Sequence, residues 1–401
     1  MRGLFILYHF LNPTEASAIQ NTRFINKLMN ESVKIQIITK GDFDIDKSEI
    51  YVLKGFPIKI LNKILLKIFP DIINLPDIER FFWSRRIRKF CDKTIDFNQF
   101  DFVHTTSSPY SVHLVGNYLK KKYKIKWIAQ FYDPWVDNNY RNFKCNYLRK
   151  LDSKYERIVA ENADLIIHSN SIIEQKWIAR YGNEIQKKIR ILPFSTEEQI
   201  NSTEIQHHQT KTQKKNYPIT IVHAGGLFAE RSINPLIEAL KILNIELSNL
   251  KELIQVNLIG SIAKKEIDLI RNSSVSDCFK IYGQKSFSLV MQEYRDADYL
   301  LLVEGLFKEN VFFPSKLCEY FSLQKPIIGI TPKNGVSYEL LKASGHFVIS
   351  SDDDIRILAD YVKIITLKKH TLVYDMEFYK KFLPEKTVEL YKAYLSEYGI
   401  I

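Results

Sequence analysis

The stretch I-V-H-A-G-G-L-F-A-E-R-S, residues 221–232, carries the clearest structural signal in this sequence. An apolar run ends in two glycines and leads into a helical pattern, which is typical of a strand–turn–helix unit in an α/β fold. Gly225 and Gly226 would let the backbone approach a phosphate closely, and the start of the following helix favours negative charge. Arg231 could form a bidentate contact with the same group. A plain strand–turn–helix with a surface arginine is the alternative.

The composition is that of a globular protein, with 45% apolar and 26% charged residues in a chain of 401. Only 14 residues are glycine, so the pair at 225–226 is informative, but it fits neither G-x-G-x-x-G nor a P-loop. A dinucleotide cofactor and a Walker-type site are therefore disfavoured. The four cysteines are far apart and argue against a zinc site or a disulfide framework. The apolar start, residues 3–11, is expected to be a buried first strand rather than a secretion signal.

Short apolar runs alternate with helical patterns on both sides of the 221–232 stretch, which predicts parallel sheets with right-handed crossovers. Residues 195–217 contain almost no apolar side chains and are the best linker candidate. We therefore expect two doubly wound domains, residues 1–200 and 201–375, followed by a helical tail, 376–401. The expected strands are 4–8, 33–39, 102–104, 127–132, 165–169 and 188–192 in the first domain, and 219–223, 255–259, 279–282, 299–303, 326–330 and 346–349 in the second.

Positive charge is concentrated in the first half, where 32 basic residues face 22 acidic ones, against 25 and 24 in the second half. Lys59, Lys63 and Lys67 recur every four residues, and cations alternate with aromatic residues between Arg80 and Lys89. Basic segments beside Trp and Phe suit a helix that lies on anionic lipid, so we expect segments 58–89 to contact an anionic membrane surface. A core helix with a solvated cationic face fits the pattern equally well. No motif indicates a nucleic-acid partner.

A second motif, F-F-P-S-K-L-C-E-Y, occupies residues 312–320. Pro314 and Ser315 indicate the start of a helix. Lys316 would then lie at the start of the helix, where its charge suits a phosphate, and Glu319 one turn further, where its carboxylate suits a ribose diol. A capped helix with an internal ion pair between these two residues is the alternative.

These motifs together resemble the retaining GT-B glycosyltransferases of the GT4 type. The similarity rests on G-G-L-x-x-x-R at 225–231, on P-S-K-L-x-E-Y at 314–320 before K-P-I-I-G, and on D-P-W at 133–135. It is greatest to the bacterial surface-polysaccharide (capsule and O-antigen) enzymes. The resemblance implies an α/β fold of the GT-B kind, two doubly wound Rossmann-like parallel-sheet domains that face a central cleft. It also implies that the tail packs back on the N-terminal domain.

The resemblance assigns roles to individual residues. Asp133 would position the acceptor hydroxyl and is the catalytic candidate. The usual pair of acidic residues in such enzymes is incomplete, because Val311 stands where the first is expected. The implied ligand-binding residues are Gly225, Gly226, Arg231 and Lys316 for the donor diphosphate, Glu319, Tyr282, Gly283, Ser315 and Leu317 for the ribose and base, and Glu15, Ala16 and Ser17 for the loop beside the acceptor and sugar.

The activity implied is transfer of a sugar from a nucleotide-diphosphate sugar, with retention, to a glycan on a polyprenyl diphosphate during surface-polysaccharide synthesis. A cytoplasmic protein at the inner face of the plasma membrane is expected. No cofactor and no essential metal are expected, and the D-x-D at 296–298 is interpreted as a helix-to-strand turn. A nucleotide-sugar epimerase of the same fold and a non-catalytic nucleotide-sugar-binding protein are the alternatives.

Overall fold

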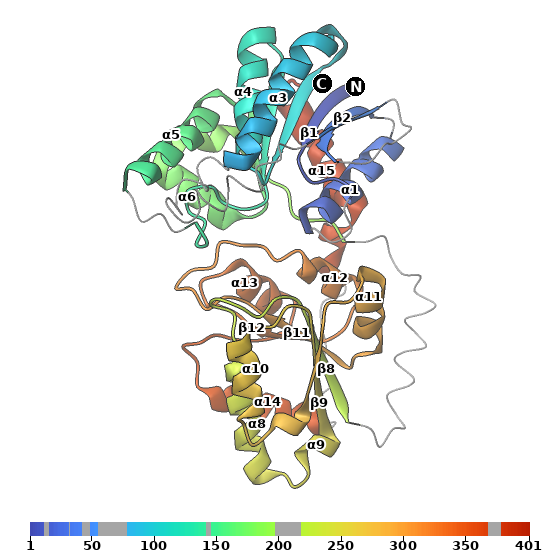
Figure 1. Cartoon of the computed structure of the whole chain (residues 1–401), viewed down its shortest axis with the longest axis vertical. Helices are drawn as coiled ribbons and strands as arrows, with labels where there is room; N and C mark the ends of the chain where they lie inside the picture. Colours follow the sequence, from blue (N-terminus) through green and yellow to red (C-terminus); the bar gives the residue numbers. More distant parts are fainter. Residues whose placement is uncertain are drawn as a thin grey trace. The chain divides into compact units, whose positions relative to one another are not determined.

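A computed structural model describes residues 1–11, 16–31, 33–41, 49–54, 78–141, 146–196, 218–367 and 378–401. The chain forms two compact units (Figure 1). Unit 1 contains Met1–Ser195 together with Pro384–Ile401, and unit 2 contains Thr196–Leu383. The C-terminal segment therefore returns to the unit in which the chain begins.

Unit 1 is built on a seven-stranded parallel sheet with the order β3-β2-β1-β4-β5-β6-β7. Its strands are β1 (Arg2–Leu7), β2 (Lys34–Lys40), β3 (Ile50–Leu53), β4 (Phe102–Ser107), β5 (Lys126–Phe131), β6 (Leu165–His168) and β7 (Ile189–Ile191). Its helices are α1 (Ala16–Asn30), α3 (Ile78–Thr94), α4 (Ser111–Tyr123), α5 (Asn146–Asn162), α6 (Ser171–Tyr181) and α15 (Pro384–Glu397).

Alternation along β1 explains how both faces of this sheet are covered. Phe5 belongs to one apolar cluster, which includes residues of α1 and α15, and its neighbour Ile6 belongs to another, which includes residues of α3 and α4. Successive side chains of a strand point to opposite faces, so a strand that is apolar throughout needs a helical layer on each side. Tyr391 of α15 is fully buried against Phe24 of α1, with ring centroids 5.0 Å apart.

Unit 2 is built on a six-stranded parallel sheet with the order β10-β9-β8-β11-β12-β13. Its strands are β8 (Ile219–Ala224), β9 (Ile254–Ile259), β10 (Phe279–Tyr282), β11 (Tyr299–Val303), β12 (Ile327–Ile330) and β13 (Phe347–Ile349). Its helices are α8 (Asn234–Glu246), α9 (Leu250–Leu253), α10 (Lys264–Arg271), α11 (Phe287–Asp296), α12 (Lys316–Ser322), α13 (Val336–Ala343) and α14 (Ile355–Thr366).

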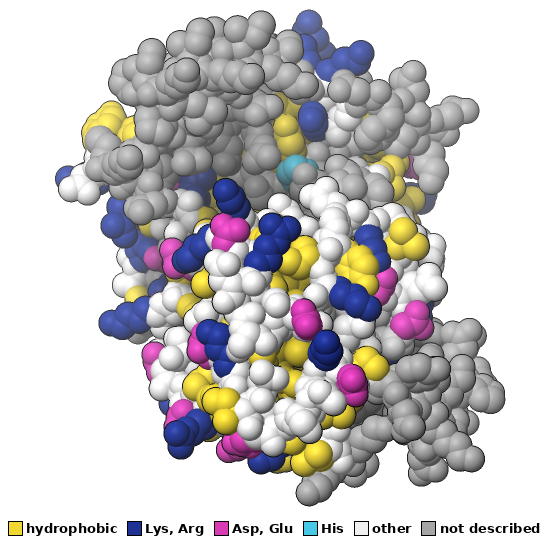
Figure 2. All heavy atoms as spheres, turned by 60° about the horizontal axis from the view of Figure 1, so that its bottom comes forward, with side chains coloured by type: hydrophobic (Ala, Val, Ile, Leu, Met, Phe, Trp, Pro, Cys, Tyr) yellow, Lys and Arg dark blue, Asp and Glu magenta, His cyan; other side chains and the backbone are white. Residues whose placement is uncertain are grey.

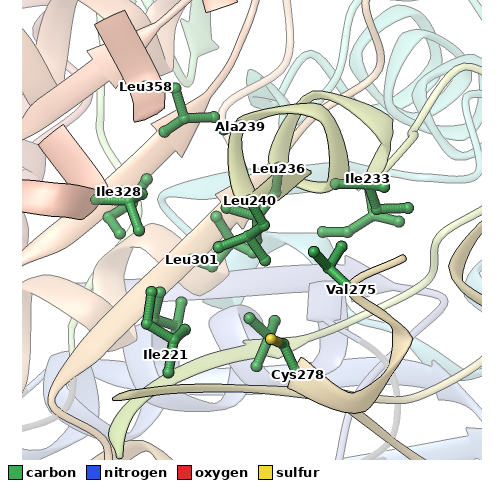
Figure 3. Packing of buried hydrophobic residues seen from close by; sticks show 14 of the residues in the cluster. Ile221, Ile233, Leu236, Ala239, Leu240, Val275, Cys278, Leu301, Ile328 and Leu358 are labelled. Carbon is green, nitrogen blue, oxygen red and sulfur yellow. The ribbon is translucent and has the colours of Figure 1, made fainter. Parts of the chain in front are cut away.

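The core of unit 2 forms where α8 and α14 pack against the sheet. Figure 3 shows Leu236 and Leu240 of α8 beside Leu301 of β11, with Leu358 of α14 nearby. The strand order reverses between β8 and β11, since β8 is followed by β9 on one side and has β11 on the other. Ligands of open α/β sheets bind beyond the carboxyl ends of the strands at such a point. The fold therefore directs attention to residues 224–231 and 304–316.

The predicted strands are all present, each displaced by at most a few residues, and both sheets are parallel as expected. The edge strand β3 was not predicted. It has only four residues, all of them half-buried, so its sequence gives neither a long apolar run nor a clear alternation. The near balance of charge in the second half is visible in Figure 2, where basic and acidic side chains are interspersed on the face of unit 2 that comes forward.

Candidate active site

The turn after β8 brings backbone and a cation together. Gly225 has φ +152°, a conformation that other residues rarely adopt. A Cβ added at Gly225 would lie 2.4 Å from Nζ of Lys316 and 3.5 Å from Nε2 of His223. A side chain at position 225 would therefore collide with the ammonium group. The positive φ favours glycine at this position, and Lys316 Nζ lies directly beside its backbone.

Lys316 begins α12, and its charge is disfavoured in the unliganded protein. Burial lowers the pKa of Lys316 to about 7, and the nearby guanidinium of Arg231 lowers this pKa further, while Glu304 opposes the change. The chain around Arg231 is held by an antiparallel bridge between Arg231 and Gly305. Two cations thus approach one point at the carboxyl end of the sheet, which is the arrangement that an anionic ligand requires.

Glu304, which directly follows β11, is a site residue that the sequence reasoning missed. Its side chain is only 5% exposed, and burial raises the pKa of its carboxyl to about 7, against the opposing influences of Ser337, Arg231, Lys316 and Asn310. The signal that could have found it is an acidic residue immediately after a buried strand, at the edge where the glycine turn also lies. Val311, where the resemblance places an acidic residue, is buried and apolar.

Four buried polar atoms at this edge form no hydrogen bond with any residue that the structure describes. Nδ1 of His223 donates to the carbonyl of Leu301 at 2.9 Å, which leaves Nε2 as an acceptor because burial holds the pKa of this imidazole well below its usual value. A buried polar group without a partner costs about 1 to 3 kcal/mol. The four atoms are His223 Nε2, Glu304 Oε2, Thr331 Oγ1 and Ser337 Oγ.

The remaining residues of the 312–320 motif lie around α12. Ser315 is its N-cap residue, but its side chain makes no capping hydrogen bond. Leu317 is fully buried in the core, so only its backbone could face a ligand. Glu319 is 6% exposed. These placements follow from a short helix whose residues 317–322 are all buried.

Tyr282 and Gly283 lie at the end of β10, at the edge of the sheet and two strands away from β8. Nζ of Lys285 lies 4.3 Å from the centre of the Tyr282 ring. A Cβ added at Gly283 would meet nothing within 4 Å, so this position is open. Gly226 differs, because a Cβ there would collide with the ring of Phe228 at 2.1 Å.

In unit 1, Asp133 follows β5 in a loop that a buried ion network holds. Nε1 of Trp135 donates to Asp152 at 2.6 Å, and the backbone amide of Val136 donates to Glu156 at 2.8 Å. Asp152 and Glu156 lie one turn apart on α5, and both are fully buried. The sequence reasoning did not single out these two carboxylates, which fix the loop that carries Asp133.

The other residues of interest in unit 1 are the arginines that pair with Asp152 and Glu156, the residues of the N-terminal loop, and the buried histidines. Arg141 pairs with Asp152 at 2.8 Å, and Arg180 pairs with Glu156 at 2.6 Å. Ala16 and Ser17 begin α1, whereas Glu15 lies outside the described residues. Three histidines are fully buried in the unit: His104, His113 and His168.

The basic segments are described only in part, because residues 58–77 lie outside the described residues. The last part, 78–89, belongs to α3, where Trp83 and Ile87 are buried and Arg85, Arg86 and Lys89 are exposed. This part is a core helix with a solvated cationic face. Over the described portion of the chain, no helix is long and apolar enough to cross a membrane.

The D-x-D at 296–298 forms the predicted turn between α11 and β11, and Asp298 accepts a hydrogen bond from the amide of Thr220 at 2.8 Å. Across the described ranges, no three His, Cys, Asp or Glu side chains are grouped as metal ligands would be.

Comparison with known proteins identifies the fold. No family model and no curated protein matches the sequence. HepE of Anabaena, solved with UDP, matches with a TM-score of 0.66 and 13% identity, over 99% of this chain and 100% of HepE. The fold is GT-B. WaaG, a glycosyltransferase involved in lipopolysaccharide biosynthesis, matches with a TM-score of 0.61 and 14% identity, over 97% of this chain and 99% of WaaG.

Sucrose-phosphate synthase of Thermosynechococcus elongatus is a third GT-B neighbour, with a TM-score of 0.62 and 14% identity, over 100% of this chain and 97% of the synthase. These neighbours are glycosyltransferases, and HepE has been solved both with UDP and with UDP-glucose. At this level of identity the likeness establishes the fold.

Proposed function

We propose that this protein is a glycosyltransferase that uses a nucleotide-diphosphate sugar as donor. One observation carries the proposal: Lys316 and Arg231 approach the glycine turn after β8, at the point where the strand order of unit 2 reverses. A diphosphate is the ligand whose charge would compensate both cations and restore the full charge of Lys316. The UDP and UDP-glucose complexes of the neighbour HepE support this choice of ligand.

The proposed reaction is retaining and needs no metal, as the GT4-type motifs imply. Negative charge develops on the departing diphosphate, and Lys316, Arg231 and the backbone at Gly225 and Gly226 would stabilise it there. Asp133 would orient the acceptor hydroxyl, whose proton passes to an oxygen of the donor phosphate as the new glycosidic bond forms. The firm hold of α5 on the Asp133 loop supports a positioning role, because catalysis depends on fixed geometry.

The ribose and base contacts are assigned to Glu319 and to the backbone around Ser315 and Leu317. Tyr282 and Gly283, at the end of the edge strand β10, are assigned to the same part of the donor. Ala16 and Ser17, with Glu15, would lie beside the acceptor and sugar. These assignments extend the proposal from the diphosphate to the whole donor. They are supported by the burial of Glu319 and by the open position at Gly283.

The proposed acceptor is a glycan on a polyprenyl diphosphate, and the proposed setting is surface-polysaccharide synthesis of the capsule or O-antigen kind at the inner face of the plasma membrane. Its support is the positive charge of residues 1–200 and the exposed cations of α3. Segments 58–89 would contact the anionic headgroups. Electrostatic attraction to such a surface falls off within a Debye length, so binding is expected to weaken with salt.

A thermal-shift panel of UDP, GDP and CDP tests the donor site, with wild type, Lys316→Gln and the exposed control Lys265→Gln. We expect one nucleoside diphosphate to stabilise wild type and the Lys265 variant but not the Lys316 variant. Stabilisation of no variant, or of all three equally, contradicts the proposal. Donor consumption that requires an added acceptor then separates a transferase from an epimerase, which needs no acceptor, and from a non-catalytic binder, which consumes no donor.

A further inference from the structure

The carboxyl edge of unit 2 contains a second group of polar residues, beside the proposed diphosphate site but chemically different from it. Glu304 follows β11, Thr331 follows β12, and Ser337 lies in the first turn of α13. All three are 5% exposed or less. Each has a side-chain oxygen that forms no hydrogen bond with a described residue.

Backbone contacts bring these three residues together. The amide of Glu304 donates to the carbonyl of Ile330, the residue before Thr331, at 3.1 Å. The amide of Asn310 donates to Asn334 at 2.9 Å, and Asn310 also forms a bridge with Gly335, two residues before Ser337. The chain that leaves β11 therefore runs beside the loop from β12 to α13. Ser337 and Asn310 are the polar neighbours of the Glu304 carboxyl.

This group does not behave as a structural ion pair. Glu304 lies near Lys316 and Arg231, since each influences its titration, yet it forms no ion pair within 4.0 Å with a residue that the structure describes. Oε2 of Glu304 is a buried acceptor that forms no hydrogen bond with a described residue, and such an atom in a native structure calls for an explanation. A ligand that donates to this oxygen would complete the network.

The chemistry of the group defines that ligand. A carboxylate would repel a phosphate but accepts hydrogen bonds from hydroxyl groups, and the Thr331 and Ser337 hydroxyls both donate and accept. A ligand that carries an anionic group and several hydroxyl groups would match both sets of residues, the cations beside Gly225 and the polar group around Glu304. The anion would lie against Lys316, and the hydroxyls would lie against Glu304.

We propose that Glu304, with Thr331 and Ser337, binds the hydroxyl groups of the donor's sugar and determines which sugar is accepted. The proposal rests on the proposed donor site for the position of the diphosphate. It adds a recognition site whose residues lie outside the sequence motifs at 221–232 and 312–320. A site whose buried groups hydrogen-bond a substrate hydroxyl discriminates strongly against ligands that lack it, because those groups are then left without partners.

The experiment separates sugar recognition from diphosphate recognition. Dissociation constants are measured for UDP, GDP, UDP-glucose, UDP-N-acetylglucosamine and GDP-mannose, on wild type, Glu304→Gln, Ser337→Ala and Glu339→Gln. Glu339 is an exposed glutamate of the same α13 and serves as the matched control. The quantity of interest is the sugar increment, defined as the affinity for a nucleotide sugar divided by that for its nucleoside diphosphate. Circular dichroism confirms that each variant folds, and Ser337→Ala provides the answer if Glu304→Gln does not fold.

We expect Glu304→Gln to lower the sugar increment of the best wild-type ligand by about 10-fold, Ser337→Ala by about 5-fold, and Glu339→Gln not at all. Affinity for the nucleoside diphosphate should change less than about 3-fold in each variant, since no phosphate contact is removed. If wild type binds no nucleoside diphosphate, the proposed function itself fails. If it binds one but no sugar adds affinity, or if Glu304→Gln weakens diphosphate and nucleotide sugar equally or neither, the sugar-binding role is overturned while the donor site stands.

Discussion

Two loops that leave parallel sheets treat buried charge in opposite ways. In unit 1, beside the loop that carries Asp133, both carboxylate oxygens of Asp152 and both of Glu156 accept hydrogen bonds. In unit 2 the edge near Lys316 and Glu304 contains buried polar atoms that lack such partners. Complete networks hold backbone in place, whereas incomplete ones indicate where a ligand completes the structure. The difference shows how one molecule can separate positioning from binding.

The same difference has opposite consequences for stability. Removing a partner from a complete buried network leaves a charge without compensation, which destabilises strongly. Removing a buried charge that has no compensating partner within the protein removes the desolvation cost of that charge. Substitutions in the two regions should therefore change stability with opposite signs.

The largest effect is expected from Glu156→Ala in unit 1. Glu156 accepts hydrogen bonds from Arg180, Tyr181 and the Val136 amide, so its loss leaves the hydroxyl and the half-buried amide without this acceptor, while Arg180 keeps its pair with Asp137. We expect the free energy of unfolding to fall by about 3 to 5 kcal/mol. Chemical denaturation measures the loss, and Glu161→Ala, an exposed glutamate on the same α5, is the control. Equal losses in both variants would mean that the network does not hold the Asp133 loop.

A smaller effect of opposite sign is expected from Lys316→Met in unit 2. Burial lowers the pKa of Lys316 to about 7, so in the folded protein the charged form is disfavoured relative to the unfolded chain, where the ordinary pKa of lysine is 10.5. The destabilisation is complete below pH 7 and disappears as the pH rises toward 10.5. We therefore expect the ligand-free variant to be more stable than wild type by roughly 1 to 3 kcal/mol at pH 6, with no gain near pH 10.

Unfolding midpoints of ligand-free Lys316→Met and wild type at pH 6 and pH 10 test this sign. Lys265→Met, at an exposed position on α10, is the control and should show no pH-dependent gain. A Lys316 variant that is less stable at both values would show that the lysine supports the fold and is not held ready for an anion. In that case, substitutions in the two regions would change stability in the same direction, contrary to the expectation.

Much of the fold could be predicted from the sequence because its signals are local. Each of the twelve expected strands is a run of apolar residues with turns or helical patterns on either side, and burial on both faces of a parallel sheet requires such runs. The edge strand β3 escaped because four half-buried residues leave no comparable pattern. Gly225 and Lys316 could also be found from local motifs, since Gly225 directly follows β8 and Lys316 begins α12, although the helix expected directly after the glycine pair begins only at Asn234.

The other half of the site depends on contacts between distant segments. Glu304 is one glutamate after a strand, and its surroundings in the fold include Ser337 and Lys316, which are distant from it in sequence. Asp152 and Glu156 have the i, i+4 spacing of solvated charges on a helix, but the loop that follows β5 and residues of α6 contact them. The chemistry of these residues is set by burial, which a sequence pattern does not record when the covering segment lies far along the chain.

The smallest effect is expected at Lys89 of α3, whose charge is exposed to solvent. Lys89 is exposed, while Trp83 and Ile87 of the same helix are buried, so Lys89→Gln removes charge without disturbing the core. If α3 contacts an anionic bilayer, the variant should bind phosphatidylglycerol vesicles about 5-fold more weakly, corresponding to about 1 kcal/mol for one cation at the surface, with an unchanged unfolding midpoint. Flotation with wild type, Lys89→Gln and the unit 2 control Lys265→Gln measures this. Equal weakening by both variants would mean that net charge alone drives binding, and no flotation of wild type would mean that the cationic face of α3 is only solvated. Either result would mean that a specific role for charge is confined to the Asp133 loop of unit 1 and to the carboxyl edge of unit 2.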